Sequence, residues 1–214
     1  MESKKYLNKF KPEYFLYLIF TVGIIGHIFQ PLLKIMLWLT PFTLLLTGSF
    51  VLFYSYKSSG NKFLIWVLIT YAITFTLELV GVKTSLIFGE YYYGNILGLK
   101  VFEVPLIIGF NWVFVILGSI SVSQFISKNN IIIAITSASI AVLFDYVLEP
   151  VAIKLNYWHW VDHIIPLQNY IAWFSIAFIS VLIFSYLKVN VKSKIGLHYL
   201  VIQFVFFLLI QIFG

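Results

Sequence analysis

Seven long apolar runs divide almost the whole chain, and this pattern constrains the fold more than any other feature. The runs cover about residues 14–30, 35–56, 63–82, 105–126, 131–150, 169–187 and 197–213. A helix needs about 20 mostly apolar residues to cross a bilayer. We therefore predict an all-α, polytopic transmembrane helix bundle of about seven spans that forms a single integral membrane domain, residues 1–214. Gln30, Pro31 and Lys34 barely separate the first two runs, so six spans is the alternative.

The composition also favours a membrane protein. Apolar residues make up 61% of the chain and charged residues only 10%, whereas a soluble domain carries about 25% charge. The net charge of +6 comes from lysines in short turns, which favours membrane lipid and not nucleic acid as a partner. The chain has no cysteine, which excludes disulfides, thiolate metal sites and cysteine nucleophiles. No small-residue cleavage site follows the basic segment Met1 to Lys11, so we expect the first run to be a retained helix.

The lysines favour one orientation, because cytoplasmic loops carry an excess of them. With the N-terminus inside, the cytoplasmic set is Lys4, Lys5, Lys9, Lys11, Lys57, Lys62, Lys128, Lys188, Lys192 and Lys194, against Lys34, Lys83, Lys100 and Lys154 outside. The outer half or outer loops then hold Glu78, Glu90, Glu103, Asp145, Glu149 and Asp162. We predict an N-terminus-inside protein of the cell (inner) membrane, with its function at the outer side, where the longer loops 83–104 and 151–168 lie.

Three acids interrupt the apolar runs, and an unpaired carboxylate inside a span costs several kcal/mol. Glu78 lies near the end of the third run, and Asp145 and Glu149 lie one turn apart in the fifth. Helical spacing places these acids, and Asn169 in the sixth run, on faces of polar or small residues. These faces are Tyr71, Thr74, Glu78 and Gly81; Ala134, Ser137, Ala138, Ala141, Asp145 and Glu149; and Asn169, Trp173, Ala177 and Ser180 in the sixth run. We expect a polar pocket between these spans near the outer surface.

The acids admit more than one interpretation. Carboxyls that share a pocket of low dielectric repel one another, which keeps at least one protonated as a Brønsted acid. Alternatively, they pair with Lys83 or Lys154, or accept hydrogen bonds from Tyr and Trp, and only fix helix packing. The pair Asp145 and Glu149 has i, i+4 spacing suited to Mg²⁺, but no second Asp-rich motif or Arg accompanies it, so we predict no metal. No histidine has a ligand partner at helical spacing; the four are His27, His159, His163 and His198.

A series of motifs runs through residues 78–173. They are Glu78-Leu-Val-Gly81-Val-Lys-Thr84, Phe88-Gly89-Glu-Tyr91-Tyr-Tyr93, Val104-Pro105 with Trp112, Asp145 to Pro150, Trp158-His-Trp160, and Pro166-Leu-Gln-Asn169 with Trp173. In order and spacing this series resembles the membrane carotenoid hydratases of bacteria and archaea. The chain departs from the family pattern at Ser85 and Ile165, where glycine is frequent, and it is short for the family.

The resemblance implies the addition of water across a terminal isoprenoid double bond of an acyclic carotenoid end, giving a tertiary alcohol without a cofactor. Asp145 or Glu78 is then the proton donor, and the other acts with Glu149 to position and deprotonate water. The expected substrate-binding residues are Tyr91, Tyr93, Trp112, Trp160, Asn169 and Trp173. The expected partners are a lipophilic carotenoid, membrane lipid and other enzymes of the carotenoid pathway.

Three other functions stay open. A Mg²⁺-dependent membrane prenyltransferase is disfavoured because the chain has no Arg for a diphosphate. A transporter or proton-relay protein is disfavoured because the polar residues cluster at one face and no repeated pair of broken helices lies near the midplane. A non-catalytic carotenoid-binding protein would tolerate Asp145→Asn and Glu78→Gln without loss of product.

Overall fold

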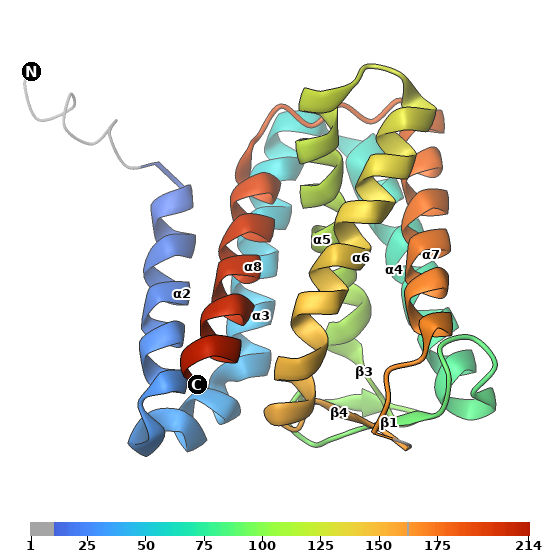
Figure 1. Cartoon of the computed structure of the whole chain (residues 1–214). Helices are drawn as coiled ribbons and strands as arrows, with labels where there is room; N and C mark the ends of the chain where they lie inside the picture. The colour runs from blue at the N-terminus through green and yellow to red at the C-terminus, as the bar shows by residue number, and fades with distance from the viewer. Residues whose placement is uncertain (1–10, 162) are drawn as a thin grey trace, which may run out of the picture.

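A computed structural model describes residues 11–161 and 163–214, and this part of the chain forms seven helices that run up and down beside one another (Figure 1). The helices are α2 (Glu13–Ile28), α3 (Gln30–Ser59), α4 (Asn61–Thr84), α5 (Leu106–Ile126), α6 (Asn130–Lys154), α7 (Leu167–Tyr186) and α8 (Ile195–Phe213). The predictions for Glu2, Lys4, Lys5, Lys9 and Asp162 concern residues outside this part.

The predicted fold class is confirmed: the chain is an all-α, polytopic membrane protein. Within the described residues, six helices are long and apolar enough to cross a membrane, and α2 is a shorter apolar helix of 16 residues. The first two runs are separated at Phe29 alone, whose backbone is extended (φ −81°, ψ 98°). Pro31 falls in the first turn of α3, where a missing N–H is tolerated. Pro41 lies inside the same helix.

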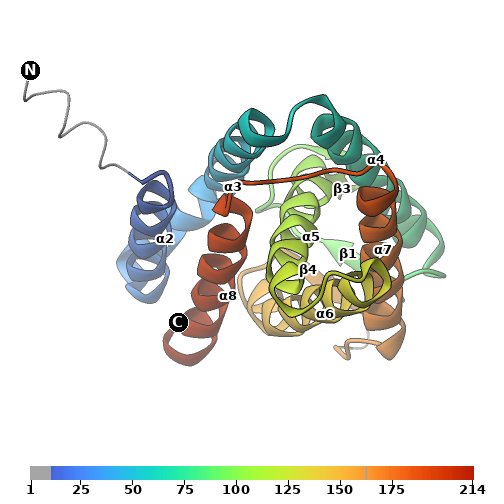
Figure 2. The same cartoon turned by 90° about the horizontal axis from the view of Figure 1, so that it is seen from above.

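Helix α5 joins the two groups of helices that make up the bundle. It packs against α3, α4, α6 and α8, and α6 packs in turn against α7. Seen along the helix axes, α4, α5, α6 and α7 surround a common centre, and α2, α3 and α8 form a neighbouring group (Figure 2). Gly118 of α5 lets α8 approach closely, because a Cβ there would lie 2.7 Å from the carbonyl oxygen of Gly196. Small residues serve this purpose where helices meet inside membranes.

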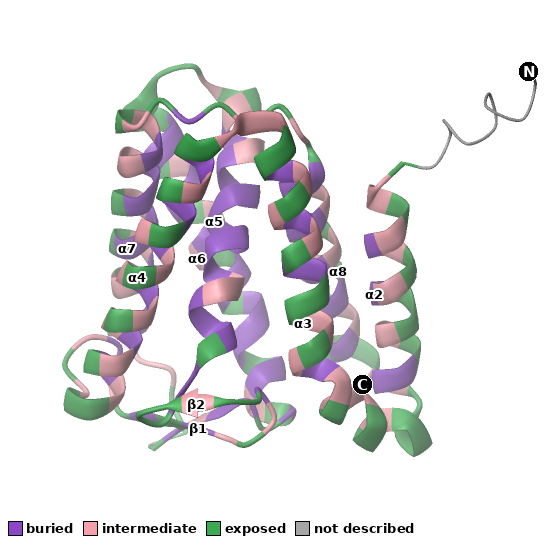
Figure 3. Ribbon diagram, turned by 180° about the vertical axis from the view of Figure 1, so that it is seen from behind, coloured by how far each residue is buried: buried purple, intermediate pink, exposed green. Residues whose placement is uncertain are grey.

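The outward faces of the helices are exposed and apolar, whereas α5 is buried along most of its length (Figure 3). Among the exposed side chains, Trp38 is 68% accessible, Leu68 68% and Leu18 63%. These surfaces suit contact with lipid acyl chains, since lipid makes no demand for polar side chains there.

Short strands close one end of the bundle, where the sequence predicted loops. Strand β1 (Tyr91–Tyr93) pairs antiparallel with β4 (Trp158–Trp160), and β2 (Lys100–Val101) pairs with β3 (Val104–Pro105). The 83–104 and 151–168 loops are shorter than predicted, because α4 continues to Thr84 and α6 continues through Pro150 to Lys154. Alternating aromatic residues fit a strand that is buried on one face only. Accordingly, Tyr92 and His159 face outward while their neighbours in β1 and β4 are buried.

Candidate active site

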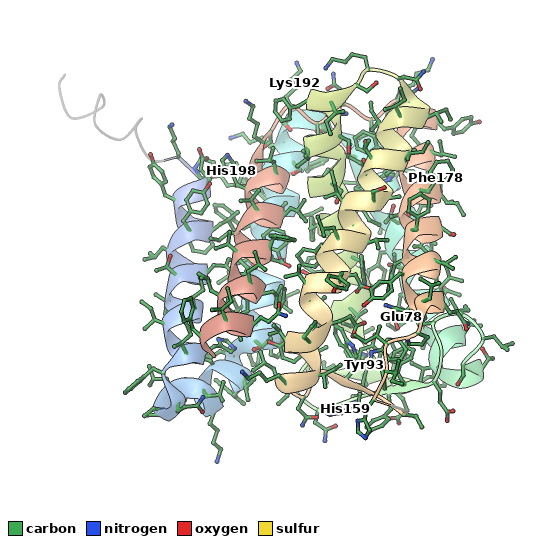
Figure 4. The ribbon with its side chains drawn as sticks, viewed as in Figure 1. Glu78, Tyr93, His159, Phe178, Lys192 and His198 are labelled. Carbon is green, nitrogen blue, oxygen red and sulfur yellow. The ribbon has the colours of Figure 1, made fainter. Side chains whose placement is uncertain are left out.

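Three carboxyl groups from two helices line one cavity at the end of the bundle that the strands close. Glu78 comes from α4, and Asp145 and Glu149 come from α6. Their side chains are 3%, 1% and 2% exposed, respectively. The cavity has a volume of about 20 Å³, which is room for about one water molecule. Figure 4 shows Glu78 and Tyr93 close together at this end, with His159 at the outer surface.

Glu78 is held by two tyrosines of strand β1. The hydroxyl groups of Tyr91 and Tyr93 both donate to Glu78 Oε2, the second over 2.7 Å. Residues two apart in a strand lie on the same face, which is why both phenols reach one carboxyl. Burial, and then the charge of Glu78, raises the pKa of both phenols well above the ordinary value of 10. Both therefore remain hydrogen-bond donors at neutral pH.

Glu149 is held in the same way by two tryptophans of strand β4. The indole nitrogens of Trp158 and Trp160 each donate to Glu149 Oε2 over 2.9 Å. The pairing of β1 with β4 therefore arranges two pairs of donors over two carboxyls. Asn169, in the first turn of α7, adds a longer contact of 3.4 Å to Glu149 Oε1.

Asp145 accepts fewer hydrogen bonds than the two glutamates. Asn169 Nδ2 donates to Asp145 Oδ2 over 2.8 Å, and among the described residues no donor is found for Oδ1. The lysines named as alternative partners are engaged elsewhere: Lys83 lies 4.5 Å above the ring of Phe102, and Lys154 donates to the carbonyl of Gly214. The acids are thus balanced by uncharged donors, which is one of the interpretations that the sequence left open.

Aromatic rings form the remaining walls. Trp112 of α5 and Trp173 of α7 stack with their ring centroids 3.6 Å apart, and Phe88 stacks on Trp173 at 5.0 Å. Tyr91 lies 5.1 Å from Trp160. A carbocation formed beside these rings would face their negative π surfaces, which attract positive charge. Because the cavity has room for about one water molecule, bulk water cannot solvate such a cation.

All nine candidate residues from the sequence lie around this cavity. They are Glu78, Tyr91, Tyr93, Trp112, Asp145, Glu149, Trp160, Asn169 and Trp173. Their chemical roles stay predictions. Trp158, Phe88 and Ile108 complete the lining. Trp158 was signalled by its alternation with Trp160, whereas nothing in the sequence distinguishes Ile108 from other apolar residues.

Other residues singled out from the sequence lie elsewhere. Tyr71 shares a helix face with Glu78 but donates to the carbonyl of Leu106 and lines a separate pocket. His159 contacts Asn156, and His198 contacts Tyr17. Helical periodicity therefore predicted correctly that Tyr71 and Glu78 share a face of α4. Tyr71 lies about two turns from Glu78 along the helix, however, and does not reach the carboxyl cavity.

Comparison with known proteins gives a family and one distant relative. A family model described as "carotenoid biosynthesis protein" matches residues 39–214. Bisanhydrobacterioruberin hydratase of Haloarcula japonica is 28% identical to the chain over 127 residues, which cover 53% of the chain and 41% of that hydratase. The match thus spans less than half the length of that relative. No solved structure matches.

Proposed function

The chain belongs to the carotenoid biosynthesis protein family, and we propose that it is an enzyme that hydrates a terminal isoprenoid double bond of an acyclic carotenoid. A role in carotenoid biosynthesis follows from the family, and the hydration is our proposal. One observation carries it: three buried carboxyls surround a cavity with room for about one water molecule, inside aromatic walls. The hydratase activity in the name of the Haloarcula japonica relative supports the same type of reaction.

Asp145 is the proposed proton donor. Its Oδ1 accepts no hydrogen bond from the described residues, so this oxygen can carry a proton and face the alkene. Oε2 of Glu78 and Oε2 of Glu149 each accept two hydrogen bonds already, so these oxygens are occupied by protein donors and are less free to present a proton to the alkene. Transfer of the Asp145 proton to the less substituted carbon of the alkene leaves a tertiary carbocation.

Glu149 and Glu78 are the proposed partners of the water molecule. The water oxygen attacks the cationic carbon and forms the C–O bond, and a glutamate takes the released proton. Asp145 and Glu149 lie one helical turn apart and share Asn169, so the proton can return to Asp145 within the same cluster. The net change is one water added to one alkene, with no redox step and no cofactor.

We propose that the substrate enters the carboxyl cavity sideways from the bilayer, between the helices. Trp112 and Trp173 each lie six residues into their helices, about 9 Å along the axis, and both line the cavity. A cavity of about 20 Å³ holds water but not an isoprenoid end. The tryptophan pair therefore has to move aside to admit the alkene, while the strand end supplies water. We place this end on the outer side of the cell (inner) membrane, from the lysine distribution.

The test is expression in cells that accumulate lycopene, followed by liquid chromatography and mass spectrometry of the extracted pigments. The wild-type chain is expected to add the mass of one water molecule to the pigment, and Asp145→Asn to abolish this gain. Glu90→Gln is the matched control, because Glu90 is an exposed acid of the same end. Hydration that survives in Asp145→Asn would contradict the assigned proton donor.

Two further measurements on the same protein separate the other functions. A product that requires Mg²⁺ and a diphosphate donor would identify a prenyltransferase. Pigment that co-purifies unchanged with the wild-type protein, from cells fed with several acyclic carotenoids, would identify a binding protein. Either outcome would overturn the hydratase proposal.

A further inference from the structure

A second, larger cavity lies between α2, α3 and α8, which stand side by side in both views (Figures 1 and 2). It has a volume of about 350 Å³, within the range of about 300–1,000 Å³ that is typical of small-molecule sites. Most of its lining is apolar, and Leu18 and Val22 at its edge are 63% and 53% exposed on the outward surface. None of its lining residues belongs to the carboxyl cavity.

Among the buried polar side chains that line this cavity, two have one atom each without a hydrogen-bond partner among the described residues. The atoms are Nε2 of His27 and Oε1 of Gln203. The side chains are only 6% and 1% exposed. A buried polar group without a partner costs on the order of 1–3 kcal/mol, and lipid supplies no hydrogen bonds to lower this cost.

Both unpartnered atoms are acceptors. His27 Nδ1 lies 2.8 Å from the carbonyl oxygen of Gly23, and a carbonyl only accepts, so in the neutral ring Nδ1 carries the proton and Nε2 has a free lone pair. Gln203 Nε2 donates to Asn111 Oδ1 over 3.1 Å, which leaves the amide oxygen free. These two acceptors therefore lack a hydrogen-bond donor among the described residues. A hydrocarbon does not supply one, and neither does a ketone.

We propose that this cavity binds the hydroxylated end of a carotenoid, with the alcohol O–H donated to His27 or Gln203. The inference rests on the proposed function, since hydration gives the hydrocarbon end of the carotenoid a hydroxyl group that can donate a hydrogen bond. The two cavities also adjoin along the chain: Tyr157 lines the larger one and Trp158 lines the carboxyl cavity. The segment that contains Tyr157 and Trp158 therefore lies between the cavity where the hydroxyl group would form and an apolar cavity with two free acceptors.

The experiment compares lycopene with its singly hydrated tertiary alcohol. The purified full chain, carrying Asp145→Asn to prevent turnover, is reconstituted in lipid nanodiscs with each pigment, and the retained pigment per protein is measured after washing. Retention of the alcohol is expected to exceed that of lycopene about tenfold, the ratio for one hydrogen bond of about 1.4 kcal/mol. His27→Phe and Gln203→Leu are each expected to reduce retention of the alcohol severalfold and to leave lycopene retention unchanged.

Two matched controls make the same substitutions outside the cavity. His198→Phe changes a histidine in the first turn of α8. This histidine contacts Tyr17 and lies outside the cavity (Figure 4). Gln211→Leu changes an exposed glutamine further along that helix. Both are expected to retain the alcohol as the parent does.

Equal retention of the two pigments by the Asp145→Asn parent would overturn the inference without any further variant, and would indicate that water alone satisfies the two acceptors. Failure of the proposed function looks different: the alcohol is still preferred and lost on His27→Phe, but the chain with Asp145 intact adds no water to lycopene in cells. The binding site and the catalytic proposal can therefore fail separately.

Discussion

Tyr93 of β1 lies directly opposite Trp158 of β4, yet the two side chains donate to different carboxyls, Tyr93 to Glu78 and Trp158 to Glu149. One antiparallel strand pair thereby holds acids from two different helices. The buried side chains of these strands pack in the apolar core, and their polar atoms determine where two of the three carboxyls point. Substitutions in these strands should therefore affect the site more than the fold class.

Removal of one hydrogen-bond donor of strand β1 should lower both the stability of the protein and its rate of hydration. Tyr93→Phe keeps the buried ring and deletes the hydrogen bond to Glu78 Oε2. A hydrogen bond to a charged group is worth about 1.5–3 kcal/mol, so we expect a lower thermal unfolding midpoint and a hydration rate at least tenfold lower. Thermal unfolding of purified protein and pigment analysis in cells measure the two effects. Tyr92→Phe is the control, since Tyr92 lies between Tyr91 and Tyr93 but faces outward; an equal effect there would contradict the role of the donor.

The protein should lose stability in alkaline solution because of its buried tyrosines. The pKa of Tyr91 and Tyr93 is raised well above 10 in the folded state by burial. Below pH 10 both states keep their phenolic protons, so the contribution of these tyrosines to stability is constant. Above pH 10 the unfolded chain releases protons that the folded chain retains, which favours unfolding. Unfolding midpoints between neutral and alkaline pH should fall less steeply in Tyr91→Phe than in the wild type, and an identical slope would refute this explanation.

The tryptophan pair should matter more for turnover than for folding. Trp173→Leu removes the ring that stacks on both Trp112 and Phe88. If these rings stabilise a cation by about 1–2 kcal/mol, the rate of hydration should fall about fivefold to thirtyfold while the protein still inserts and purifies. Trp38→Leu, at a tryptophan that is 68% exposed, should hydrate at the wild-type rate. A full rate in Trp173→Leu would remove this residue from the proposed cation site.

The orientation can be tested because the chain has no cysteine. Asn95→Cys introduces an exposed thiol at the strand end, and Asn130→Cys introduces one at the start of α6, at the opposite end of the bundle. With the N-terminus inside, a membrane-impermeant maleimide should label intact cells at position 95 and label position 130 only after permeabilisation. The reverse pattern would invert the predicted topology.

The sequence by itself determined the helical architecture, because the length of an apolar run decides whether a segment can satisfy its backbone within a bilayer. The period of 3.6 residues also placed Glu78, Asp145 and Asn169 on buried helix faces before any contact was known. The aromatic motifs identified Tyr91, Tyr93 and Trp160 as candidates, although they were predicted to lie in loops. These inferences depend on local spacing, which a sequence displays directly.

Only the tertiary structure decided which groups meet. The pairing of β1 with β4 joins segments separated by more than 60 residues. No local pattern specifies that the tyrosines Tyr91 and Tyr93 donate to Glu78. Nor does one specify that the tryptophans Trp158 and Trp160 donate to Glu149. The unpartnered acceptors of His27 and Gln203 likewise became visible only when α2 and α8 were placed together. Hydrogen bonds between distant side chains depend on how the helices pack in three dimensions, and the periodicity of a single chain does not encode that packing.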